Sequence, residues 1–169
     1  FSGSVRAGVS ALLAAVRAVK AGGAADVLVT AADVRLAPPE TELEGVLGDG
    51  AGAFLVSDHD VIAEFVDAAS IAEEFTYVWR LDTSRTLEVA GGRFSNVYGY
   101  GRDLGPAIKG VLERQKLEPK AIHHLALYSP DARASADLAK SLGFDPKTQL
   151  VAPLGPEIGC TGSAESFLL

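Results

Sequence analysis

An alanine-rich segment near the start of the chain, "SVRAGVSALLAAVRAVKAGG", places the strongest constraint on the fold. Its larger apolar residues recur three and four positions apart, which is the spacing of one face of an α-helix. A helix so dense in small side chains packs closely on other backbone, and Gly22-Gly23 supply its end. The larger apolar residues are Val5, Val9, Leu12, Leu13, Val16 and Val19.

Short apolar strands alternate with further helices along the rest of the chain. We expect buried strands near 27–30, 54–57 and 125–128, and helices over 102–117 and 131–144. This alternation predicts an α/β fold in which parallel strands lie between helices.

Three segments give weaker signals. The β-branched and aromatic residues of 61–81 favour strand, with a break near 68–69. The polar, glycine-rich stretch 82–101 is typical of a loop. The segment 155–169 predicts a glycine-rich turn that leads into an apolar helix.

Charge and composition exclude several function classes. The formal net charge of −7 argues against nucleic acid or an anionic membrane as the main partner. No apolar run approaches the 18 residues or so of a membrane span, and no signal peptide is visible. The one cysteine, Cys160, allows no internal disulfide and no cysteine-based metal site, so we expect a cytoplasmic protein without metal or redox cofactor.

Two features of the sequence indicate that the chain is a piece of a longer protein. It contains no methionine, and it stops within the apolar stretch "SAESFLL". We therefore expect further strands and part of any active site to come from segments outside it.

Glycine-rich stretches and histidines offer only weak site signals by themselves. "GDGAGAF" lacks the Lys-Ser/Thr of a P-loop and precedes a strand, so tight turning and close backbone packing are favoured over phosphate binding. "GCTGSAESFLL" precedes a helix, where free N–H groups can bind an anion or a carbonyl oxygen. His123 and His124 occupy adjacent strand positions and face opposite sides, while His59 lies in a polar turn.

Several stretches together resemble one family. They are "VRAGVSALLAA", "GDGAGAFLVSD", "VWRLDTSRTLEVAGGRFSNVYGY", "LALYSPDARASADLAKSLGF" and "EIGCTGSAESFLL", and they occur in collinear order. The chain resembles the thiolase superfamily, in its hydroxymethylglutaryl-CoA synthase and ketoacyl-ACP synthase III-like branch.

The resemblance implies a layered αβαβα fold, duplicated and usually dimeric, of which this chain covers the middle part. Residues 1–80 would end the N-terminal half, and residues 81–169 would start the C-terminal half. Family members make or break carbon–carbon bonds on acyl thioesters, using a cysteine at a helix N-terminus together with histidine and asparagine.

Carrying the family's catalytic positions over to this chain gives other residues. Val5 stands at the cysteine position, or Phe1 in a looser alignment. Tyr128 stands at the histidine position, before Ser-Pro-Asp, and Cys160 stands at the asparagine position. The resemblance implies that Tyr128 lies close to Cys160, and that N–H groups of the turn at Gly159, Gly162 and Ser163 bind substrate.

These replacements allow three hypotheses about the function of the chain. The favoured one is a non-catalytic thiolase-like subunit, either a homodimer or a heterodimer with an active homologue. In the second, a site around Tyr128, with Asp131 or Arg133 nearby, carries out acyl transfer or retro-aldol cleavage of an acyl-CoA or acyl-ACP thioester. The third is an acyl-CoA binding or scaffolding module, for example beside a small zinc/OB-fold partner.

Overall fold

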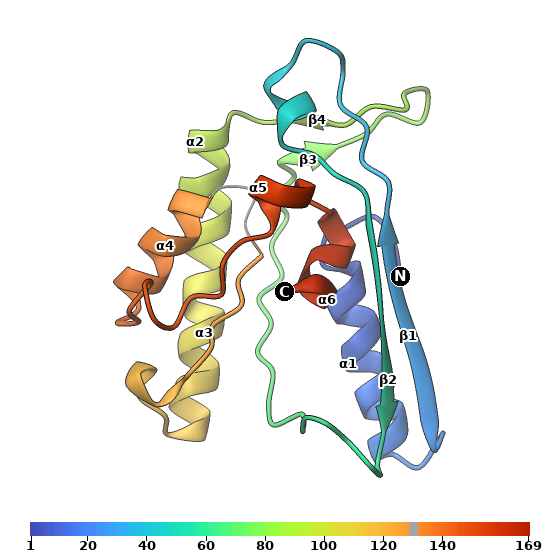
Figure 1. Cartoon of the computed structure of the whole chain (residues 1–169), viewed down its shortest axis with the longest axis vertical. Coiled ribbons are helices and arrows are strands. Elements are labelled where there is room, and N and C mark those ends of the chain that lie inside the picture. Colours follow the sequence, from blue (N-terminus) through green and yellow to red (C-terminus); the bar gives the residue numbers. More distant parts are fainter. Residues whose placement is uncertain (129–131) are drawn as a thin grey trace. The chain divides into compact units, whose positions relative to one another are not determined.

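A computed structural model describes residues 1–128 and 132–169 of the chain. Its helices and strands confirm the predicted α/β class (Figure 1). The α-helices are α1 (Ala7–Lys20), α2 (Gly92–Ser95), α3 (Gly101–Gln115), α4 (Ala132–Ser141), α5 (Gly155–Ile158) and α6 (Glu165–Leu168). The strands are β1 (Asp26–Asp33), β2 (Gly50–Ser57), β3 (Val78–Trp79) and β4 (Glu88–Val89). The other helical turns are η1 (Glu42–Gly45), the π-helix η2 (Asn96–Tyr100), η3 (Pro119–Ala121) and η4 (Gly162–Ala164).

The chain forms two compact units. The first contains Phe1–Arg35, Gly45–Val66 and Leu154–Leu169, and the second contains Leu36–Glu44 and Asp67–Pro153. The assignment of residues 1–80 and 81–169 to the two halves of a thiolase-like fold stays a prediction.

The first unit is built on a hairpin-like pair of strands with α1 along one face (Figure 1). β1 and β2 pair antiparallel over their full lengths, from Asp26 opposite Ser57 to Asp33 opposite Gly50. The expectation of parallel strands is wrong for this pair, because apolar content predicts a strand but not its direction.

Burial of the hairpin is one-sided, which corrects the prediction of fully buried strands. Val29 and Ala31 point to the covered face and are buried. Leu28 and Leu55 point to the other face, and they are 67% and 66% exposed. The reason is geometric, since successive strand residues face opposite sides of a sheet and α1 covers one of them.

Glycines of β2 allow the end of the chain to approach its backbone. A Cβ on Gly50 would come within 2.7 Å of Cβ of Thr161, and one on Gly52 within 2.8 Å of Cβ of Phe167. Both distances are too short for two carbon atoms that are not bonded to each other. The interpretation of "GDGAGAF" as a close-packing motif agrees with this geometry.

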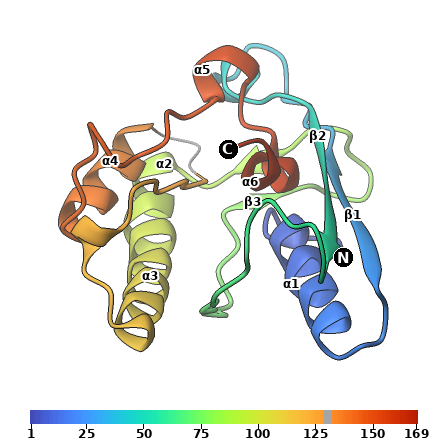
Figure 2. The same ribbon diagram turned by 60° about the horizontal axis from the view of Figure 1, so that its bottom comes forward.

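In the second unit, α3 and α4 pack side by side (Figure 2). Both helices were predicted, with bounds that differ by a few residues. α3 ends at Gln115, and the residue that caps it, Lys116, has a left-handed backbone with φ of 54°. The third predicted strand, 125–128, is reduced to one bridge between Leu125 and Leu150.

Two sequence predictions fail in this unit. Of the strand predicted over 61–81, only Val78–Trp79 pairs, and it pairs with β4. The loop predicted over 82–101 contains β4, α2 and the π-helix. Aromatic side chains order this glycine-rich stretch, because Phe94 stacks on Phe75 with ring centres 5.6 Å apart and contacts Tyr98 at 5.1 Å.

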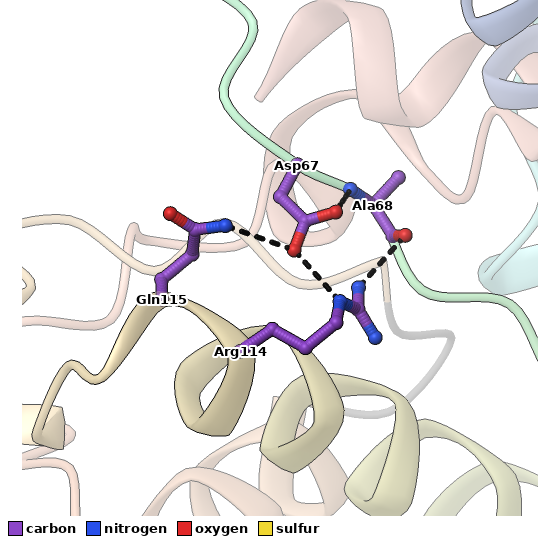
Figure 3. Close-up of polar contacts among 4 residues, drawn as sticks. All are labelled: Asp67, Ala68, Arg114 and Gln115. Atoms are coloured by element: carbon purple, nitrogen blue, oxygen red, sulfur yellow. Dashed lines mark hydrogen bonds and ion pairs between the residues drawn. The ribbon is translucent and has the colours of Figure 1, made fainter.

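An ion pair fixes the extended segment after residue 66 to the C-terminal turn of α3 (Figure 3). Arg114 donates from Nε to Oδ2 of Asp67 at 3.0 Å and from Nη2 to the carbonyl of Ala68 at 3.0 Å. Gln115 donates to the same carboxylate oxygen at 3.1 Å. The hydrogen bond from Arg114, followed by that from Gln115, lowers the pKa of Asp67 to about 2.

This ion pair predicts a specific pH dependence of stability. Because the pKa of Asp67 is depressed by folding, its contribution is fully present above the unfolded value of about 4 and is lost as pH falls towards 2. Asp67→Asn is therefore expected to lower stability at pH 7 but to converge with wild type near pH 2, as measured by urea denaturation. Asp82→Asn, at an exposed carboxylate of the same unit, is the control. A constant difference between Asp67→Asn and wild type across this range would contradict the prediction.

Candidate functional site

Cys160 lies in a buried crossing of two backbone segments in the first unit. Its N–H donates to the carbonyl of Val46 at 2.7 Å, and its own carbonyl accepts from the N–H of Gly48 at 3.1 Å. Its side chain is 3% exposed. These bonds hold Cys160 at a defined position beside the stretch that leads into β2.

A buried arginine contacts this cysteine. Nη1 of Arg35 donates to Sγ of Cys160 at 2.9 Å. Arg35 follows β1 by two residues, and its N–H donates to Oδ1 of Asp49 at 2.8 Å. The residues at the ends of β1 and at the start of β2 therefore place a permanent cation against the thiol.

The turn before α6 is shaped by glycines with left-handed backbone. Gly159 has φ of 74° and Gly162 has φ of 59°. The N–H of Ser163 donates to Oδ2 of Asp33 at 3.1 Å, and the N–H of Gly159 donates to the carbonyl of Gly155 at 2.9 Å. Two of the N–H groups expected to bind substrate thus have partners within the fold, and the predicted substrate role of the turn stays a prediction.

The N-terminus of α1 lies against the same turn. A Cβ on Gly8 would collide with the carbonyl oxygen of Ser163, so this glycine permits the contact. Val5 is partly buried in the turn that precedes α1, and Phe1, its alternative at the family's cysteine position, is exposed. Neither side chain contains a nucleophilic atom.

Tyr128 ends the segment that is bridged at Leu125, and it is partly buried. The Ser-Pro-Asp that follows it, including Asp131, lies outside the described residues. Tyr128 belongs to the second unit and Cys160 to the first, so the expected proximity of their side chains stays a prediction.

Arg133, near the start of α4, lines a cavity of the second unit. The cavity has a volume of about 360 Å³ and lies between α4 and the segment where η2 continues into α3. Its lining mixes polar and apolar side chains, and Arg133 is the cation among them. The other polar side chains are Asn96, Tyr100, Asp137 and Ser141.

The histidines are exposed. His123 and His124 lie on the surface of the second unit. Nδ1 of His59 lies 3.1 Å from Oδ1 of Asp58 and 2.8 Å from Oγ of Ser57. The hydrogen bond with Asp58 raises the pKa of His59. Among the described residues, no group of three or more His, Cys, Asp or Glu side chains is arranged to hold a metal ion.

Curated relatives of this chain share one description. This chain is 30% identical over 136 residues to the hydroxymethylglutaryl-CoA synthase of Thermoplasma volcanium. The matched residues cover 80% of this chain and 38% of that protein. The chain is 28% identical over 169 residues to the enzyme of Methanocella arvoryzae, covering 99% of this chain and 48% of that one. The chain thus spans less than half the length of these relatives. No family model matches it.

Solved structures agree with these relatives. The 3-oxoacyl-(acyl carrier protein) synthase III of Pseudomonas aeruginosa superposes with a TM-score of 0.82 at 24% identity, over 99% of this chain and 55% of that one. MvaS in complex with 3-hydroxy-3-methylglutaryl coenzyme A superposes with a TM-score of 0.82 at 20% identity. The match covers 97% of this chain and 49% of that one. These relatives and structures support the resemblance to the thiolase-like superfamily. Both sets of matches are to the hydroxymethylglutaryl-CoA synthase and synthase III-like branch, the one that the sequence motifs resemble.

One contact at this site was not predicted from the sequence. Arg35 and Asp33 meet the turn at 159–163 across more than 120 residues of sequence. A local signal existed, because "ADVRLAPP" puts two charges directly after an apolar strand, where α/β proteins place functional groups. In the described part of the chain, no helix is long and apolar enough to cross a membrane.

Proposed function

We propose that this chain is part of an acyl-CoA-handling, thiolase-like protein that acts as a non-catalytic subunit beside an active homologue. The observation that carries the proposal is Val5. At the N-terminus of α1, where the family implies a nucleophilic cysteine, this chain has a side chain without a nucleophilic atom.

The packing around that position supports a retained scaffold. Gly8 still admits the carbonyl of Ser163, and the glycines of β2 still admit the end of the chain. Retention of the frame without the nucleophile fits a role in binding and assembly, and we propose that the protein works in the cytoplasm as one half of a thiolase-like dimer.

A CoA thioester is the ligand class that fits this role. MvaS has been solved in complex with 3-hydroxy-3-methylglutaryl coenzyme A, and an HMG-CoA synthase has been solved in complex with CoA. The cavity beside Arg133 combines a guanidinium with apolar side chains, which suits a phosphate-bearing ligand with an extended chain.

A second candidate function has its own observation. The hydrogen bond from Arg35 to Cys160 puts a cation against the thiol at the position where the family implies asparagine. Such a pair suits a retooled site that transfers an acyl group or cleaves a β-hydroxyacyl thioester, with Tyr128 as the proton-transferring group.

Tyr128→Phe separates the two candidate functions. In the full-length protein with its partner, the variant is expected to change cleavage or condensation of a β-hydroxyacyl-CoA far less than the hundredfold or more that loss of a general acid–base group costs. Tyr98→Phe, at an exposed tyrosine of the same unit, is the matched control. A hundredfold fall in kcat for Tyr128→Phe alone would overturn the non-catalytic proposal and favour the retooled site.

A further inference from the structure

Arg35 is a cation buried within the first unit. It is 6% exposed, and Nη1 points at Sγ of Cys160 at 2.9 Å. Cys160 is itself 3% exposed, so water screens this contact little. The pair belongs to the first unit, whereas the cavity lined by Arg133 belongs to the second.

The chemistry of the two groups decides which form of the cysteine is stabilised. A guanidinium stays protonated in proteins and offers only donors. A thiol is a weak acceptor, whereas a thiolate accepts a charge-assisted hydrogen bond and is attracted by the positive charge. Since Coulomb attraction grows as the effective dielectric constant falls, a buried contact favours the thiolate more than the same contact in water.

Three carboxylates on the neighbouring elements would repel a negative charge on the sulfur of Cys160. Backbone N–H groups donate hydrogen bonds to two of these carboxylates. Oδ2 of Asp33 accepts the N–H of Ser163, and Oδ1 of Asp49 accepts the N–H of Arg35 itself. Each carboxylate is therefore stabilised in place by a donor other than the guanidinium Nη1 that faces the sulfur. Glu165, buried at the start of α6, is the third acidic group on the elements that pack here.

We propose that Arg35 holds Cys160 as a thiolate, forming a buried guanidinium–thiolate pair. The pair puts an anion that can accept a proton where the family resemblance implies a neutral amide that donates one. This assignment goes beyond the proposed function and does not depend on it, because it concerns the ionisation of one side chain in the folded protein.

The test is the ultraviolet absorbance of the thiolate, measured as the difference between wild type and Cys160→Ser from pH 5 to 9 in the protein as purified. An ordinary cysteine, with a pKa of about 8.5, is about 1% thiolate at pH 6.5. Most of the thiolate signal is expected at that pH in wild type. Arg35→Gln is expected to remove it, Arg35→Lys to keep part of it, and Arg17→Gln, at an exposed arginine of α1, to leave it unchanged.

Either of two results would overturn the proposal. One is a wild-type signal that appears only above about pH 8, as for a free cysteine. The other is an Arg35→Gln protein, folded by circular dichroism, that retains the wild-type titration. The wild-type measurement needs no change at Arg35, so it decides the question even where Arg35→Gln does not fold.

Discussion

After incubation with acetyl-CoA or a longer acyl-CoA, no acyl group is expected on the segment 1–20 of this chain, and any stable adduct within the chain is expected on Cys160. Val5, at the family's nucleophile position, cannot form a thioester. Cys160 is the single cysteine of the sequence, and its contact with Arg35 favours the nucleophilic thiolate form.

Peptide mapping by mass spectrometry measures this outcome directly. Cys160→Ser is expected to abolish the adduct, an all-or-none effect. Ser4→Ala, which removes an exposed hydroxyl beside the N-terminus of α1, is expected to leave it unchanged. An acyl group that persists within the chain in Cys160→Ser, or one that maps to the segment before α1, would show that the nucleophile has been misassigned.

The helices of this fold could be predicted from sequence because their signals are local. The periodic apolar residues of α1 and α3 and the glycines that follow α1 act within a few residues of each other. Strand burial could not be predicted in the same way. Whether Leu28 is covered depends on what packs against its side of the hairpin, and no local pattern contains that information.

The candidate site likewise has features that the sequence predicts and features that it does not. The glycines of the turn at 159–162 are visible in the sequence, and their left-handed backbone follows from their type. The contact between Arg35 and Cys160 joins residues 125 positions apart, so only the tertiary fold reveals it. The segment 61–81 shows the opposite error, since its residues suit a strand but most of them have no strand pairing in the described structure.

Gly162→Ala is expected to destabilise the protein by about 2–5 kcal/mol. Two effects add at this position. A left-handed backbone costs an alanine about 1–2 kcal/mol, and φ here is 59°. The new Cβ would also collide with Oδ2 of Asp33 and come within 2.9 Å of Cδ of Arg35, and overpacking of this kind costs about 1–3 kcal/mol.

Gly22→Ala separates the two effects. Gly22 also has left-handed backbone, with φ of 69°, but nothing lies within 4 Å of its added Cβ. It is expected to lose only the backbone part, about 1–2 kcal/mol, in urea denaturation. The excess loss in Gly162→Ala then measures how tightly Asp33 and Arg35 hold the turn beside Cys160. Equal losses in the two variants would mean that these side chains move aside freely, and a turn that yields so easily would not keep the guanidinium of Arg35 against the sulfur.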